Sequence, residues 1–197
     1  MNQSLPLAWG WVTSPLELSS FILSIITVAL NIKQIHWAWL FSILSSALYC
    51  LVFFDAKLYG DSGLQIVFIL VSIWGWTQWV WRGENQQTIS VTRLRAPERI
   101  IAVLAWCGIF VLLYFFLKLF TDTDVPMADG FLTAGSLLGQ LLLSRKKLEN
   151  WYVWILVDVL YVGLYLYKGL MLTALLYAIF VVMAIAGARA WSALCRK

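Results

Sequence analysis

The sequence predicts an all-α membrane protein with seven transmembrane helices, arranged as two parallel three-helix repeats joined by one linker helix. Three observations lead to this fold class: the composition, the long apolar segments and an internal repeat. Of the 197 residues, 62% are hydrophobic and 12% are charged, whereas a soluble domain carries about 25% charged residues. The chain is therefore too apolar for an ordinary soluble domain.

Seven apolar segments predict the membrane spans. A helix needs roughly 20 apolar residues to cross about 30 Å of hydrocarbon, because it rises about 1.5 Å per residue. The segments are 16–35, 37–54, 62–81, 99–119, 127–144, 150–167 and 170–190. The fourth carries no charge from Ile100 to Leu117, whereas the second is short and the fifth contains several polar residues.

The internal repeat relates the first three predicted helices to the last three. Seven positions align at a spacing of 112 residues: Trp39, Ser42, Ser46, Tyr49, Phe53, Gly75 and Trp79 with Trp151, Trp154, Asp158, Tyr161, Tyr165, Gly187 and Trp191. Because three spans reverse the direction of the chain, two such units are parallel only if one further helix crosses back. An order of three, one and three helices is therefore predicted, and parallel repeats are typical of carriers.

The repeat and the loops divide the chain into five predicted parts. These are a periplasmic N-terminal segment (1–15), a first repeat (16–82), a cytoplasmic loop (83–97), the linker helix (98–120) and the second repeat (127–193). Seven spans place 11 of the 14 basic residues in one set of loops. Since cytoplasmic loops are rich in Lys and Arg, the N-terminus is predicted in the periplasm and the C-terminus in the cytoplasm of a bacterial inner membrane.

Polar side chains follow one face of most predicted helices, but not of the linker. The stripes in the first and fifth helices have the same spacing: Ser20, Ser24, Thr27 and Asn31, and Asp129, Thr133, Ser136 and Gln140. Gln65 belongs to the stripe of the third helix, and Tyr177 to that of the seventh. Unpaired polar groups are costly in hydrocarbon, so these faces should meet. They either join helices or line a pathway, and their match between the repeats favours a pathway.

Asp158 is the one ionisable side chain well inside a predicted span. A carboxylate at the membrane centre costs about 2.5–3.5 kcal/mol on insertion scales, so it usually faces a cavity or a partner. Trp151 and Trp154 lie seven and four residues before it on the same helix face. Indole rings and a carboxylate together suit an organic cation. Two alternatives are a hydrogen bond from a Ser or Tyr of a neighbouring helix, and proton coupling.

Sequence motifs that mark several other classes of protein are absent from this chain. GxxxxGK[ST], HExxH and GxSxG are absent, and a single His leaves no metal cluster or catalytic triad. We therefore expect no enzyme, no cofactor, no metal ion and no nucleic-acid partner, and the basic loops are interpreted as topology signals. Two alternative classes stay open. One is a membrane-embedded enzyme for a lipid substrate, with Asp122, Asp124 and Asp129 as its acidic cluster, and the other is a scaffold or receptor subunit.

Three segments resemble the PnuC family of vitamin transporters: LYGDSGLQ (58–65), WGWTQW (74–79) and RKKLENWYVWILVD (145–158). The resemblance covers about residues 16–191. It implies a SWEET-like fold and uptake by facilitated diffusion, with the vitamin trapped by phosphorylation inside the cell. By the matching motif, the substrate site would include Asn150, Trp151, Trp154 and Asp158. The polar stripes add Gln65, Gln140, Ser136 and Tyr177 as further candidates.

The expected substrate is a cationic aromatic vitamin, with thiamine first and nicotinamide riboside second. The resemblance implies Asn in the nicotinamide riboside carriers of enteric bacteria where this chain has Asp158, and an amide can both donate to and accept from a carboxamide. An ionised carboxylate only accepts, which suits the aminopyrimidine and the positive thiazolium ring of thiamine. The short chain also resembles the thiamine branch, called PnuT. The lipid bilayer is the other expected partner, and a homo-oligomer is compatible with the sequence.

Overall fold

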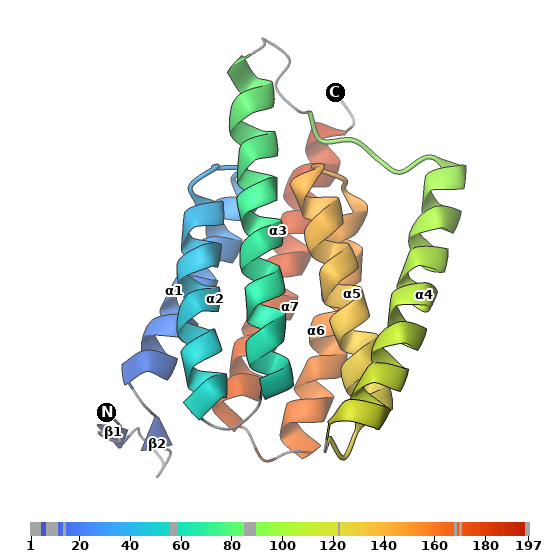
Figure 1. Cartoon of the computed structure of the whole chain (residues 1–197). Helices are drawn as coiled ribbons and strands as arrows, with labels where there is room; N and C mark the ends of the chain where they lie inside the picture. Colours follow the sequence, from blue (N-terminus) through green and yellow to red (C-terminus); the bar gives the residue numbers. More distant parts are fainter. Residues whose placement is uncertain are drawn as a thin grey trace. The chain divides into compact units, whose positions relative to one another are not determined.

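The computed structural model describes residues 5–6, 12–13, 15–55, 59–84, 90–121, 123–167, 169 and 171–195. These residues form seven α-helices (Figure 1): α1 (Pro15–Ile32), α2 (Ala38–Asp55), α3 (Tyr59–Glu84), α4 (Ala96–Phe120), α5 (Pro126–Ser144), α6 (Glu149–Tyr167) and α7 (Met171–Leu194). Each helix overlaps one predicted span, so the all-helical fold class is confirmed. Two short strands that the sequence did not predict, β1 (Leu5–Pro6) and β2 (Val12–Thr13), pair antiparallel before α1.

Four of the described helices are long and apolar enough to cross a membrane. They are α4, α6, α7 and the Ser62–Val80 part of α3. Shorter apolar helical stretches occur in α1 (Leu18–Ile32) and α2 (Ala38–Leu51). α5 is long enough with 19 residues but is not among the apolar helices, because its Asp, Ser and Gln side chains lower its hydropathy. The protein is thus a multi-pass membrane protein, and the number of seven spans stays a prediction.

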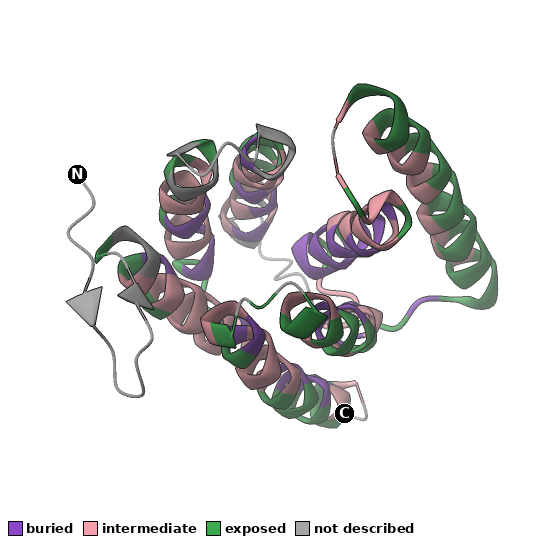
Figure 2. Cartoon of the chain, turned by 90° about the horizontal axis from the view of Figure 1, so that it is seen from below, coloured by how far each residue is buried: buried purple, intermediate pink, exposed green. Residues whose placement is uncertain are grey.

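The chain divides into two compact units, Met1–Trp76 (unit 1) and Thr77–Lys197 (unit 2). In unit 1, α1 packs against α2, and Ser72 and Gly75 of α3 contact α2. The ring centre of Trp76 of α3 lies 6.0 Å from that of Trp37, just before α2. In unit 2, α5 lies between α4 and α6, and α6 packs against α7. α5 carries more buried residues than any other helix of unit 2, 11 against six in α7 and five in α6 (Figure 2).

Aligned residues of the internal repeat make the same tryptophan–glycine contact in both units. Trp39 of α2 is 1% exposed, and a Cβ added to Gly75 of α3 would lie 2.5 Å from its ring. Trp151 of α6 is 3% exposed, and a Cβ added to Gly187 of α7 would lie 2.6 Å from its ring. Glycine is therefore required at both positions, because any side chain would occupy the space of the indole ring. The spacing of 112 residues is a repeat of packing as well as of sequence.

Serine hydroxyls join neighbouring helices in unit 1. Ser24 of α1 and Ser45 of α2 share a hydrogen bond of 2.7 Å between their hydroxyls. Ser42 of α2 and Ser72 of α3 share one of 3.0 Å. These contacts join helices. For Ser24, a member of the matching stripes, the hydrogen bond supports the packing interpretation rather than the pathway.

α4 lies along α5 at the edge of unit 2, and none of its described residues is buried. Its outer side is exposed along its whole length in Figure 2. Trp106 attaches α4 to α5 through two contacts with Phe131. The indole Nε1 donates a 3.1 Å hydrogen bond to the carbonyl oxygen of Phe131, and the two rings stack with their centres 5.0 Å apart. Gly135 of α5 provides the space for this indole, since a Cβ there would lie 2.6 Å from the ring.

The segment just before α4 is fastened to the turn between α5 and α6. Thr92 forms a parallel bridge with Lys147. The Glu149 carboxylate accepts a 2.9 Å hydrogen bond from the backbone N–H of Leu94, and it forms an ion pair of 3.5 Å with Arg99. The sequence predicts a loop for 83–97, and it does not reveal this backbone pairing. We refer to residues 91–95 and 146–149 together as the basic-end clasp.

Candidate functional site

α6 carries the four residues of the predicted motif. Trp151, Trp154 and Asp158 share one helix face because they are three and four residues apart. Asn150, Trp151 and Asp158 are buried, and Trp154 is half-buried. The motif therefore lies inside unit 2 rather than on its surface.

Asp158 is 3% exposed, and its Oδ1 atom has no hydrogen-bond partner in the part of the chain that the structure describes. One sequence-based alternative was a hydrogen bond from a neighbouring Ser or Tyr, and no such donor reaches this oxygen among those residues. A buried polar atom without a partner is costly and rare in native proteins. Such an atom is expected where a ligand, an ion or water supplies the missing partner.

Trp154 lies against α5. A Cβ added to Gly139 of α5 would lie 2.9 Å from the indole ring, so glycine allows this close approach. Ser136 and Gln140 flank Gly139 on α5 and are both buried. The Ser136 hydroxyl donates a 2.9 Å hydrogen bond to the carbonyl oxygen of Leu132 within its own helix. α5 and α6 thus bring a motif tryptophan next to the α5 polar stripe.

Asn150 and Trp151 have contacts that explain much of their burial. Asn150 Nδ2 donates a 2.6 Å hydrogen bond to the carbonyl oxygen of Lys147, which closes the turn before α6. Trp151 covers Gly187 and meets the ring of Trp191 edge-on at 5.4 Å. Both also keep a buried atom without a hydrogen-bond partner among the described residues, Asn150 Oδ1 and Trp151 Nε1. Asn150 and Trp151 therefore pack unit 2, and each keeps one polar atom that a ligand could bind.

Three tyrosines of α6 and α7 form a cluster of aromatic rings. The ring of Tyr177 lies 4.7 Å from that of Tyr161 and 5.1 Å from that of Tyr165. Tyr161 follows Asp158 by three residues on the same helix face. The sequence placed Tyr177 among the site residues but did not group it with Tyr161 and Tyr165. The four-residue spacing of Tyr161 and Tyr165 is the signal that could have indicated the cluster.

Gln65, the eighth predicted residue, is half-buried on α3 in unit 1, whereas the other seven belong to unit 2. That Gln65 belongs to the same site as the seven residues of unit 2 stays a prediction. Of the acidic cluster weighed for a lipid enzyme, Asp122 lies outside the described residues. Asp129 accepts a 2.6 Å hydrogen bond from the Thr123 hydroxyl at the start of α5. That contact gives Asp129 a structural role at the helix terminus.

The helices and the buried motif define the class of protein. It is a multi-pass membrane protein with buried polar side-chain atoms on α6 that have no hydrogen-bond partner among the described residues. A family model described as nicotinamide mononucleotide transporter matches residues 14–193. The riboflavin/roseoflavin transporter RibM of Streptomyces davaonensis is 31% identical over 178 residues, which cover 86% of this chain and 81% of RibM. The nicotinamide riboside transporter PnuC of Escherichia coli is 22% identical over 213 residues, which cover 93% and 87%.

A crystal structure of the vitamin B3 transporter PnuC has the same fold. Its TM-score is 0.76 at 21% sequence identity, and the match covers 92% of this chain and 82% of that chain. The chain belongs to the PnuC family of membrane vitamin transporters. The family predicted from the sequence motifs is therefore confirmed. The relatives are transporters, which supports a transporter over the alternative of an enzyme.

Proposed function

We propose that this protein carries a cationic aromatic vitamin across the bacterial inner membrane by facilitated diffusion, with thiamine as the first candidate. The observation that carries this proposal is Asp158, a buried carboxylate with an oxygen that lacks a hydrogen-bond partner among the described residues. A cationic ring with an amino group supplies both the opposite charge and the donor. Phosphorylation of the vitamin in the cytoplasm would keep it inside the cell.

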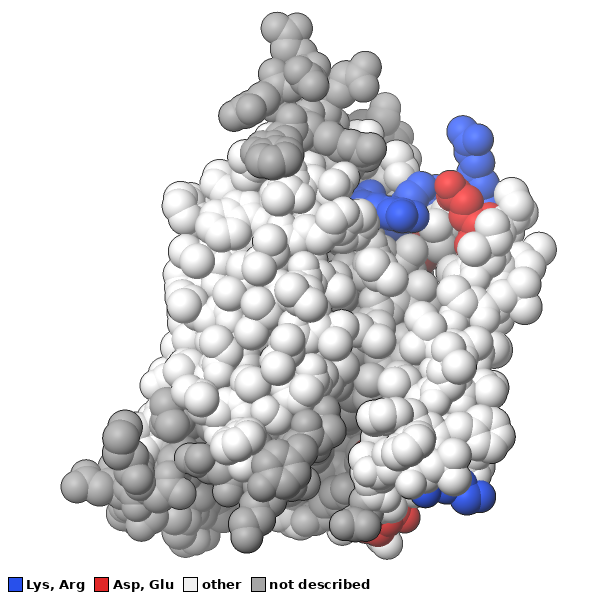
Figure 3. Space-filling model, in the orientation of Figure 1, with Lys and Arg blue, Asp and Glu red and all other residues white. Residues whose placement is uncertain are grey.

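We propose that α1–α3 and α5–α7 are the two parallel repeats and that α4 is the linker, with the N-terminus in the periplasm and the C-terminus in the cytoplasm. The shared tryptophan–glycine contact and the exposed position of α4 support this arrangement. On the visible face of unit 2, charged side chains gather at the two ends of the helices, with none between them (Figure 3). That distribution fits helices that cross a bilayer.

Each proposed site residue has a chemical role. Asp158 binds the positive charge, and Trp154 and Tyr177 offer ring faces for stacking and cation–π contacts. The buried Asn150 Oδ1 and Trp151 Nε1 atoms offer an acceptor and a donor. The remaining polar candidates are Ser136 and Gln140 from α5, and Gln65 from α3.

Nicotinamide riboside is the second candidate, because relatives matched over most of this chain are nicotinamide riboside transporters. It is also cationic, so Asp158 suits it as well. Riboflavin is the third ligand to compare, because RibM is a riboflavin transporter that is 31% identical to this chain. Riboflavin carries no positive charge, so an ionised Asp158 offers it no charge pairing.

Binding of the three vitamins to the purified protein, measured by calorimetry, tests the proposal. We expect thiamine to bind with the lowest Kd and labelled thiamine to enter proteoliposomes without ATP. Asp158→Asn should raise the Kd for thiamine about tenfold or more, because a hydrogen bond to a charged group is worth about 1.5–3 kcal/mol. The same variant should leave the Kd for riboflavin nearly unchanged. The absence of thiamine binding, or an equal Kd for the variant, would refute the proposal.

A further inference from the structure

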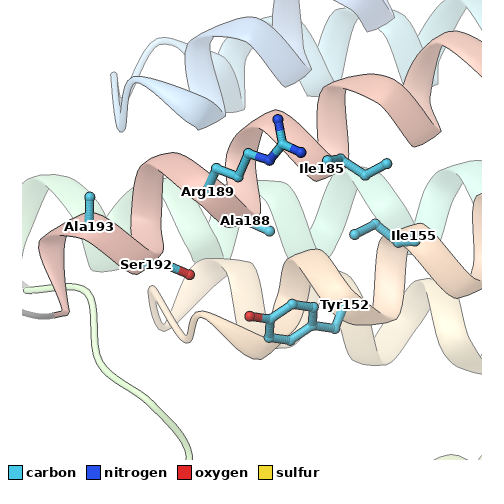
Figure 4. A pocket seen from close by; sticks show the side chains of 7 residues that line it. All are labelled: Tyr152, Ile155, Ile185, Ala188, Arg189, Ser192 and Ala193. Carbon is cyan, nitrogen blue, oxygen red and sulfur yellow. The ribbon is translucent and has the colours of Figure 1, made fainter.

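A surface groove of about 430 Å³ lies between α6 and α7. Its lining residues are Tyr152, Ile155, Ile185, Ala188, Arg189, Ser192 and Ala193. Figure 4 shows the hydroxyls of Tyr152 and Ser192 directed toward one another, while the guanidinium of Arg189 extends from α7 at the other rim. None of the eight predicted site residues lines this groove.

The groove is polar at one end and apolar toward the middle of the helices. Tyr152 lies in the first turn of α6, and Arg189 and Ser192 lie in the last two turns of α7, so all three belong to one end of unit 2. Ile155 and Ile185 lie about one helical turn deeper. Beyond them the helices present exposed apolar side chains, including Val159 at 51% and Val182 at 67% exposure. A phospholipid has the same order of a polar headgroup and apolar chains.

Charge decides which headgroup fits. Arg189 is exposed and has no ion-pair partner among the described residues. The other residues that line the groove are neutral, so Arg189 is its one charged group. The same end of unit 2 carries Arg145, Lys146 and Lys147 in the turn before α6. Basic pockets between membrane helices on the cytoplasmic side bind anionic headgroups. The unpaired guanidinium on one rim of the groove is suited to a phosphate, and the two hydroxyls on the other rim are suited to other headgroup oxygens.

We propose that this groove binds an anionic phospholipid from the leaflet at the basic end of the protein. The phosphate binds the Arg189 guanidinium, and the hydroxyls of Tyr152 and Ser192 donate hydrogen bonds to neighbouring headgroup or ester oxygens. One acyl chain lies along Ile155 and Ile185. This lipid site shares no residue with the proposed vitamin site and does not depend on which vitamin is carried.

Native mass spectrometry of the purified full chain with phosphatidylglycerol or phosphatidylcholine tests the lipid site. We expect the wild-type protein to retain phosphatidylglycerol about fivefold more tightly than phosphatidylcholine, in line with one cation near an anionic lipid. Arg189→Gln should lose this preference. Arg93→Gln is the matched control, because Arg93 is an exposed cation of unit 2 outside the groove, and it should keep the preference.

The thermal midpoint in detergent gives a second measurement. Phosphatidylglycerol should raise the midpoint of the wild-type protein more than inorganic phosphate does at equal concentration. Equal retention of both lipids by the wild-type protein would refute the site, even if Arg189→Gln does not fold. An equal loss of preference in Arg189→Gln and Arg93→Gln would also refute it, as would an equal effect of inorganic phosphate.

Discussion

Asp158 and Trp154 show how single residues acquire different surroundings on one helix face. Asp158 is buried with an oxygen that no described donor reaches, whereas Trp154 is half-buried and rests on Gly139. Trp151, on the same face, is packed between Gly187 and Trp191. The two motif tryptophans are therefore not equivalent, and Trp154 is the better placed of the two to contact a ligand.

At the residue scale, Trp154→Ala tests the stacking role. We expect it to weaken thiamine binding by about 1–3 kcal/mol, a factor of about 5–150 in Kd, because one ring face is lost. Calorimetry with the purified variant measures the change. Trp37→Ala is a suitable control, because Trp37 is an exposed tryptophan of unit 1 and its loss should leave Kd unchanged. An unaltered Kd for Trp154→Ala would remove Trp154 from the site.

At the scale of elements, helix pairs are joined where a glycine on one helix receives an indole from the next. At four glycines, an added Cβ would lie within 3 Å of a tryptophan ring: Gly75, Gly135, Gly139 and Gly187. The sequence displayed these glycines, and it also predicted each helix within a few residues of its observed ends. It did not indicate which tryptophan each glycine receives, because that depends on how two helices are rotated and shifted against one another.

Gly187→Ala tests this packing. The added methyl group should overlap the Trp151 ring and destabilise the protein by about 1–3 kcal/mol, which a lower thermal midpoint in detergent would report. Gly163→Ala is the matched control, because a Cβ at this exposed α6 position meets nothing within 4 Å. The control should leave the midpoint unchanged or raise it, since alanine favours helix over glycine by about 1 kcal/mol. Equal midpoints for the two variants would contradict the packing role.

At the scale of the whole molecule, the distribution of charge predicts how the chain crosses the membrane. Two ion pairs join the basic-end clasp to the first turn of α4: Glu149 pairs with Arg99, and Lys147 Nζ lies 3.4 Å from Glu98 Oε2. Such a cluster is compatible with an aqueous cytoplasmic surface and not with hydrocarbon. The proposed orientation therefore places the clasp and the C-terminus inside the cell.

Fusions to the two chain ends test this orientation. A C-terminal green fluorescent protein should fluoresce, because it folds in the cytoplasm. An N-terminal epitope tag should be removed by protease added to spheroplasts, because that end lies outside. A dark C-terminal fusion together with a protected N-terminal tag would reverse the orientation, and it would also move the proposed lipid site to the outer leaflet.

The sequence by itself determined the helices, the internal repeat and the family, because apolar periodicity, charge placement and short motifs are local properties of the chain. It also indicated Asp158 as an unusual buried acid. Only the tertiary structure decided that Ser24 and Ser42 bond to serines of neighbouring helices, that Trp151 is packed against α7, and that Leu94 meets Glu149 across 55 residues of sequence. These contacts depend on which helix faces pack together, and residue spacing within one helix does not fix that choice.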